Sequence, residues 1–215
     1  NSPTAQFSPE GTVKIGGNFL NTNITPDKWD YNTFNFFLNI TFFSFFEAAI
    51  NNTAFDLHDR GKFDNVDRSI SVRLRALKEG RYHPAIAIGS NDLLTSNKTS
   101  LFSGSGGNKY FGSHYIALSK SISAGPFDLG LHTAYNILSS RHKSLDNPIS
   151  GGISISPKAL SSTRFFSDLS LIAEYDTRNI NLGSSMMVFR HLYFQIFIQD
   201  FKYICFGAHA QFNIF

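Results

Sequence analysis

The chain has 215 residues and a formal net charge of +3; 42% of its residues are apolar and 15% aromatic, with 23 Phe. This length fits one large domain, and we assign residues 1–215 to a single one. No apolar run approaches the roughly 18 residues of a membrane helix, which excludes helical spans. No basic run supports nucleic-acid binding, and a single cysteine, Cys205, excludes an internal disulfide. The first residues carry no signal-peptide pattern, so in an exported protein this sequence would be the mature form.

Alternation of apolar and polar side chains with period two runs through most of the chain and predicts β-strands with two different faces. In residues 33–43, for example, Phe36, Leu38 and Ile40 share a face opposite Asn35. The predicted strands, about twelve in number, cover residues 12–20, 33–43, 45–55, 69–76, 83–91, 113–122, 127–136, 149–156, 168–176, 179–188, 192–199 and 204–214. No helix is predicted, because the apolar spacing of three and four residues is absent.

The predicted links between strands alternate in length. Most odd-numbered links are long and polar, at residues 21–32, 57–67, 92–112 and 137–147. Most even-numbered links are tight, at residues 43–45, 78–82, 123–125 and 189–191, with 157–165 as an exception. Long loops at one end and short turns at the other are typical of outer-membrane barrels, and an even strand count places both termini at the short-turn, periplasmic end. Phe215 is out of phase with the apolar face of the last strand, which predicts either an inward Phe215 or a chain that continues.

The fold class predicted from these patterns is all-β: a transmembrane, antiparallel, up-and-down β-barrel of about 12 strands. The alternative is a soluble β-barrel or sandwich, because alternation does not show which face looks inward. Three features favour the membrane barrel. The polar face carries charges near mid-strand, the apolar face is bulkier than a small closed core can pack, and aromatic residues cluster near strand ends. We therefore expect the bacterial outer membrane as the location and its lipid as a partner.

A set of charged and polar side chains falls on the face opposite the apolar one, and we predict that it faces the lumen. Its members are Lys14, Glu47, Arg73, Arg75, His132, Asp168, Glu174 and Asp176. One interpretation is that these groups pair and plug the lumen, because unpaired buried charge is costly. The other is a polar conduit suited to a sugar chain. Barrels of about eight strands are filled and those of roughly sixteen or more are open, so the strand count leaves both interpretations, and we favour a plugged or narrow lumen.

An E-G-x-Y-x-P stretch, with Glu79, Gly80, Tyr82 and Pro84, lies between two predicted strands. Gly80 supplies free dihedral angles, and Pro84 begins the next strand where its missing N–H is tolerated. We interpret this stretch as a tight periplasmic turn on the basis of its turn chemistry. The alternative is a docking surface for a periplasmic partner.

Support for catalysis is weak. Outer-membrane lipid hydrolases need a Ser–His pair oriented by a third polar group. The candidate histidines are His114, His132, His191 and His209. Neighbours in a strand point to opposite faces, so Ser113 cannot easily serve His114. We assign no catalytic residue and expect that the protein is not an enzyme.

Support for a metal site is equally weak. Asp168, Glu174 and Asp176 share one predicted strand face, and carboxylates in such a row can hold calcium near a barrel rim. Solvated or Arg-paired carboxylates are the favoured interpretation. We expect no metal ion and no cofactor.

Several segments resemble one known family in the same order along the chain. The opening Pro3–Ala5 and Pro9–Thr12 resembles the "PTA…DG" start of the YjbH-like exopolysaccharide biosynthesis proteins. Residues 67–89, with Asp92, resemble that family's strand, E-G-x-Y-x-P-A turn and A-x-G-x-x-D sequence. Residues 111–120 and 171–176 resemble its "Y-x-V-A-S-K" and "L-K-A-E-Y" strands. The chain departs from the family in the Ser/Gly-rich loop after Asp92 and in Ile172, which replaces a lysine.

The resemblance implies an outer-membrane role in exopolysaccharide production. Our leading hypothesis is a non-enzymatic barrel that serves exopolysaccharide export or assembly, with polysaccharide and other envelope proteins as partners. The second is a structural or accessory barrel in a larger outer-membrane complex, with a lumen closed by Arg–carboxylate pairs. The third is a lipid-modifying hydrolase, which needs a Ser–His–acid set at the outer-leaflet rim.

Overall fold

The structure, a computed structural model, describes residues 2–21, 32–55, 66–96, 112–138, 147–161 and 165–215. Its strands are β1 (Thr12–Leu20), β2 (Thr33–Phe42), β3 (Phe46–Phe55), β4 (Val66–Leu77), β5 (Ala85–Ser96), β6 (Ser113–Ala124), β7 (Phe127–Leu138), β8 (Ile149–Pro157), β9 (Phe166–Tyr175), β10 (Ile180–Val188), β11 (Leu192–Gln199) and β12 (Tyr203–Asn213). Two short helical elements, η2 (Phe43–Phe45) and α1 (Lys158–Ser161), lie between strands. None of the helices in these ranges is long and apolar enough to cross a membrane.

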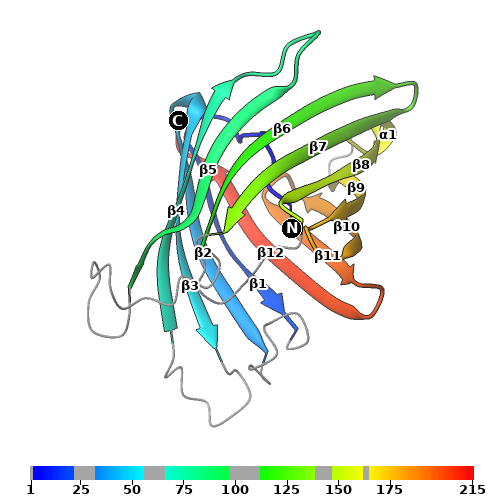
Figure 1. Cartoon of the computed structure of the whole chain (residues 1–215). Helices are drawn as coiled ribbons and strands as arrows, with labels where there is room; N and C mark the ends of the chain where they lie inside the picture. Colours follow the sequence, from blue (N-terminus) through cyan, green and yellow to red (C-terminus); the bar gives the residue numbers. More distant parts are fainter. Residues whose placement is uncertain (1, 22–31, 56–65, 97–111, 139–146, 162–164) are drawn as a thin grey trace.

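The twelve strands form one closed antiparallel barrel, in which β1 pairs with β12 (Figure 1). Closure leaves no sheet edge with unpaired backbone groups. The predicted all-β barrel is confirmed, and every predicted strand is present. The boundaries differ most from the prediction for β4, which begins earlier, at Val66, and for β5, which ends later, at Ser96. Polar residues at these strand ends hide the alternation on which the prediction rests.

The prediction that the chain has no helix is wrong for α1, a helix of four residues in the link between β8 and β9. Four residues make only about one helical turn. A periodic apolar pattern needs more than one turn to become visible, so this element leaves no signal in the sequence.

The two ends of the barrel differ in their links, as predicted. The short-turn end carries the links 43–45, 78–84, 125–126, 158–165 and 189–191. The long-loop end carries the links 21–32, 56–65, 97–112 and 139–148, most of which lie outside the described residues, and the shorter links 176–179 and 200–202. β1 begins and β12 ends at the short-turn end. Phe215 lies beyond β12 and is 89% exposed, so it does not turn into the interior.

The barrel wall separates two kinds of side chain. Every strand presents exposed large apolar residues on its outer face, such as Phe36, Ile88 and Leu171. The inner face is mostly small or polar, with a few aromatic rings such as Phe197: Ala87 and Ala117 are fully buried. The usual order of a water-soluble domain, with bulky apolar residues inside, is therefore reversed.

Candidate functional site

Residues Ser2–Ser8 lie inside the barrel, and residues 9–11, of which Pro9 and Glu10 are exposed, connect them to β1. We call Ser2–Ser8 the plug segment. The backbone N–H of Ser8 donates a hydrogen bond to Glu47 Oε1 on β3 (3.0 Å). The backbone N–H of Ser2 donates to Glu174 Oε2 on β9 (3.2 Å). Because β3 and β9 lie on opposite sides of the ring of strands, the segment crosses the lumen (Figure 1). The prediction that both termini lie at the short-turn end is therefore wrong for the N-terminal residues, because Ser2 is bonded to Glu174 and Tyr175 at the other end of β9.

Ala5, in the middle of the plug segment, packs against four inward-facing alanines and one tyrosine of the barrel wall. We call this packing site the seat of Ala5. Ala5 is 1% exposed, and its N–H donates to Ser119 Oγ (2.8 Å). The seat is formed by Ala85, Ala87, Tyr115, Ala117 and Ala134. Larger inward side chains on β5, β6 and β7 would fill the space that the backbone of the segment occupies. These inward alanines were the signal in the sequence that could have revealed an internal segment.

Glu47 is the most enclosed charged side chain among the described residues, at 1% exposure. Its Oε2 accepts a hydrogen bond from Arg73 Nε (2.7 Å) and forms an ion pair with Arg73 Nη2 (2.5 Å). Its Oε1 accepts from Thr41 Oγ1 (3.1 Å) and from Ser8 N–H. The buried charge is thus compensated by a cation and several donors, which is the condition for burying a carboxylate at an acceptable free energy.

Further interactions of cationic side chains surround the Glu47–Arg73 pair. The guanidinium groups of Arg73 and Arg75 lie 4.5 and 5.1 Å from the ring centre of Phe7 in the plug segment. Arg75 also donates to the Ser44 carbonyl at the short-turn end. Lys14 on β1 interacts electrostatically with both Glu47 and Arg73. Four of the eight predicted lumen residues therefore gather on this side of the lumen.

His132 and Glu174 meet on the other side of the lumen. His132 Nε2 lies 4.0 Å from Glu174 Oε2, the same oxygen that accepts from Ser2 N–H. The two residues come from β7 and β9, with Gly152 of β8 between them. They form the wall contact for the far end of the plug segment.

Asp168 borders the lumen on the same side as His132 and Glu174, whereas Asp176 lies in a turn. Asp168 is exposed and has a φ of +54° at a bulge in β9 opposite Ser185 and Met187. The extra residue of the bulge disturbs the strict alternation along β9, but the Asp168 side chain still lines the lumen. Asp176 follows β9, and its carboxylate accepts from the N–H of Asn179 (2.9 Å) and from the side chain of Asn181 (2.9 Å). It therefore orders the β9–β10 turn, as Asp commonly does in turns.

The turn at 78–84 is fastened to β6. Gly80 N–H donates to His83 O (3.2 Å), which closes the turn. Glu79 accepts from Ser121 N–H (2.8 Å) and pairs with Lys120 Nζ (3.2 Å). Partial burial alone would raise the pKa of Glu79, but these donors hold it below its usual value. Tyr82 is 87% exposed, and Pro84 directly precedes β5, so these contacts fit the structural interpretation of the turn.

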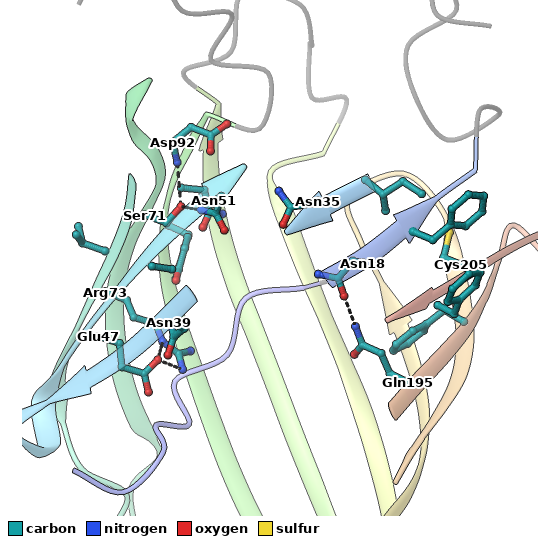
Figure 2. A pocket seen from close by; sticks show the side chains of 18 residues that line it. Asn18, Asn35, Asn39, Glu47, Asn51, Ser71, Arg73, Asp92, Gln195 and Cys205 are labelled. Atoms are coloured by element: carbon teal, nitrogen blue, oxygen red, sulfur yellow. Dashed lines mark hydrogen bonds and ion pairs between the residues drawn. The ribbon is translucent and has the colours of Figure 1, made fainter. Parts of the chain in front are cut away.

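Two hollows remain in the lumen beside the plug segment. The first, about 440 Å³, lies toward the long-loop end and includes Glu47 and Arg73 in its wall (Figure 2). The second, about 310 Å³, is lined in part by Ser2 and Thr4 of the plug segment. Gln195 and Phe197 of β11 line both hollows. We call the first hollow the amide cavity.

The amide cavity takes its name from side chains that the sequence reasoning did not single out. They are Asn18, Asn35, Asn39, Asn51, Asn91 and Gln195. They come from β1, β2, β3, β5 and β11. Figure 2 shows Asn18, Asn35, Asn39, Asn51 and Gln195 around one space. Their inward position follows from alternation, but their gathering depends on strand register, which the sequence does not reveal.

The structure separates the candidate catalytic residues. Asn91 Nδ2 in the inner wall donates to Ser113 Oγ (3.0 Å), so Ser113 points inward and the exposed His114 outward. His114 lies opposite Ser90 in the β5–β6 register, and the buried Ser90 hydroxyl has no hydrogen-bond partner within the described ranges. His209 stacks on Tyr193 with ring centres 4.6 Å apart.

A metal centre is not formed by the part of the chain that the structure describes. No group of three or more His, Cys, Asp or Glu side chains in this part could hold a metal ion. The carboxylates considered for calcium are dispersed: Asp168 lies at a bulge, Glu174 at the plug segment and Asp176 in a turn.

Comparison with known proteins gives the family. A comparison with curated proteins finds no match. The family model described as exopolysaccharide biosynthesis protein YbjH (YjbH) matches residues 1–168. That range includes the plug segment, the strands that hold Ala5 and the Glu47–Arg73 pair. The chain therefore belongs to the YjbH family of exopolysaccharide biosynthesis proteins.

Proposed function

We propose that the protein is a non-enzymatic outer-membrane barrel that serves export or assembly of exopolysaccharide. The observation that carries this proposal is the reversed barrel, apolar outside and polar inside, in a chain of this family. A lipid environment matches the outer face, because apolar side chains gain nothing from facing water. Phe43 and Phe45 at the short-turn end are 62% and 50% exposed, which fits an aromatic belt at a membrane interface.

The polar lumen supports contact with a sugar chain. Hydroxyl groups of a saccharide need both donors and acceptors, and amide side chains supply both. The plug segment occupies the middle of this lumen, so a conduit requires that it move aside. Its polar contacts to the wall are a few hydrogen bonds, each worth roughly 1 kcal/mol net, and it adds no strand to the sheet.

A second candidate function is favoured by the Glu47–Arg73 pair and the seated plug segment. Both close the lumen, which suits an accessory barrel of a larger outer-membrane complex for the same polysaccharide. In that case the partner proteins, and not the lumen, carry the sugar chain.

Membrane fractionation and planar-bilayer conductance together test the proposal. We expect the protein in the outer-membrane fraction and a reduced yield of extracellular polysaccharide in cells that lack it. We expect low conductance for the whole chain and higher conductance for a variant without residues 1–8. If that variant folds but conducts no better, the conduit is excluded and the accessory role is retained. Recovery in the soluble fraction would overturn the membrane proposal itself.

A further inference from the structure

The amide cavity has walls rich in unsatisfied amide groups. Asn35, Asn51 and Asn91 each donate one hydrogen bond to a neighbouring hydroxyl, which leaves the Oδ1 atom of each without a side-chain bond within the described ranges. Asn18 Oδ1 accepts a hydrogen bond from Gln195 Nε2 (3.0 Å). The Asn18 amide N–H groups and Gln195 Oε1 then remain available to a ligand. The cavity therefore offers several acceptors and donors at once.

Asn39 is the clearest case among these amides. Its Oδ1 is buried and has no hydrogen-bond partner among the described residues. Figure 2 shows it beside Glu47 and Arg73, whose own groups are bonded to each other. A buried amide oxygen without a partner costs free energy in the empty site. Rotation of the Asn39 amide toward the cavity would let a ligand hydroxyl bond this oxygen and remove that cost.

The charges around the amide cavity compensate one another. Among the described residues that line it, the cation is Arg73, which pairs with Glu47 through Nε and Nη2. Asp92 accepts from Ser69 Oγ (2.5 Å), and nearby Lys14 adds one positive charge. An anionic sugar such as a uronate would need a guanidinium or ammonium group that is not already paired. The lining does not supply one, so the cavity suits an uncharged ligand.

Two buried aromatic rings complete the lining. Tyr115 and Phe197 are 7% and 6% exposed and belong to β6 and β11. Sugar rings have C–H faces that pack against aromatic rings, and the rings keep their orientation because they are buried. The volume of about 440 Å³ lies within the range of small-ligand pockets, roughly 300–1,000 Å³. It fits a short stretch of a saccharide chain.

We propose that the amide cavity binds a short uncharged saccharide segment. Asn18, Asn35, Asn39 and Asn51 would bond its hydroxyl groups, and Tyr115 and Phe197 would contact its ring faces. This inference rests on the proposed role in exopolysaccharide handling and adds the chemical class of the bound segment.

The test is calorimetric titration of the purified, detergent-solubilised whole chain with tetrasaccharides. The neutral probes are cellotetraose, maltotetraose and N-acetylated chitotetraose, and the anionic probe is tetragalacturonate. We expect at least one neutral probe to bind and the anionic probe to bind at least about tenfold more weakly, a difference of roughly 1.4 kcal/mol. Binding of the anionic probe alone, or of none of the probes, would overturn the inference.

Matched variants of β2 and β3 locate the site. Asn51→Ala and Asn39→Ala should each weaken binding of the neutral probe about fivefold to tenfold, as expected for one lost hydrogen bond to a ligand. Asn52→Ala is the control, because this neighbour of Asn51 points to the outer face. Circular dichroism and heat-dependent gel mobility establish that each variant folds.

The outcomes separate this inference from the proposed function. Unchanged binding of the neutral probe by both cavity variants would show that the amide cavity is not the binding site. A barrel that fractionates with the outer membrane and is needed for polysaccharide yield, but binds no neutral probe, would overturn only the inference. A protein outside the outer membrane would overturn the proposed function.

Discussion

Glu47 on β3 and Arg73 on β4 form a two-point ion pair inside the barrel, with 2.7 and 2.5 Å between the Arg73 nitrogens and Glu47 Oε2. The same carboxylate holds the plug segment through Ser8 N–H, and Arg73 holds it through the Thr4 carbonyl and the Phe7 ring. The pair therefore joins the wall of the barrel to the segment that crosses it.

Replacing one member of this pair should destabilise the barrel. Glu47→Gln leaves the Arg73 charge inside without its partner, and we expect a loss of about 3 kcal/mol in unfolding free energy. Urea unfolding of the barrel in lipid vesicles measures it. The exposed Glu10→Gln is the matched control and should change little. The double variant Glu47→Gln/Arg73→Gln should recover part of the loss; a single variant as stable as the control would show that the pair is not structurally important.

Locking the plug segment should keep the lumen closed. Ala5 N–H lies 2.8 Å from Ser119 Oγ, so Ala5→Cys with Ser119→Cys places two thiols close together, in a Cys205→Ser background. We expect voltage-induced openings in planar bilayers with the reduced pair and none with the oxidised pair. Equal conductance before and after reduction would argue against movement of the segment.

Overfilling the seat of Ala5 should expel the plug segment. Ala117 is fully buried in that seat. Ala117→Leu adds side-chain volume in the space that the plug segment occupies. Overpacking of this kind would destabilise the bound plug segment by about 1–3 kcal/mol. We expect residues 2–8 to become accessible to limited proteolysis while the barrel remains folded. Leu118→Ala, on the outer face of the same strand, is the control and should leave the segment protected.

The turn at 78–84 should make stability depend on pH. The pKa of Glu79 lies below its usual value of 4.5, because Ser121 N–H and Lys120 outweigh its partial burial. The stabilisation that ionised Glu79 gives to the folded barrel is therefore fully present above the pKa that Glu79 has in the unfolded chain. It is lost as the pH falls through the lower pKa that Glu79 has in the folded protein. Glu79→Gln should cost less than about 1 kcal/mol near neutral pH, as for other exposed pairs. Below the folded pKa the variant and the parent should unfold alike; a gap that widens on acidification would contradict this assignment.

The proposal of a non-enzymatic barrel predicts that Ser90 and His114 are dispensable for lipid composition. Ser90→Ala and His114→Ala expressed in cells should leave phospholipid and lysophospholipid profiles unchanged by mass spectrometry. A drop in lysophospholipid in both variants would instead support the lipid-hydrolase hypothesis and name its nucleophile and base.

Several site features were within reach of sequence reasoning, and others were not. Alternation placed Lys14, Glu47, Arg73 and Arg75 on the inner face, where the structure has them. It did not reveal the bulge at Asp168, because an extra residue in one strand becomes apparent only when that strand is paired with its neighbour. The amide cavity was missed because strands far apart in sequence contribute its side chains, and only closure between β1 and β12 brings Asn18 to Gln195.

The sequence by itself determined a barrel of about twelve strands, its apolar and polar faces, and the difference between its two ends. These properties depend on neighbours along one strand, whose side chains alternate by geometry alone. The folded structure alone shows that Ser2–Ser8 fill the lumen, that Glu47 bonds Arg73, and that six amides meet in one cavity. Those facts depend on register and on contacts across the lumen, between residues as far apart as Ser2 and Glu174.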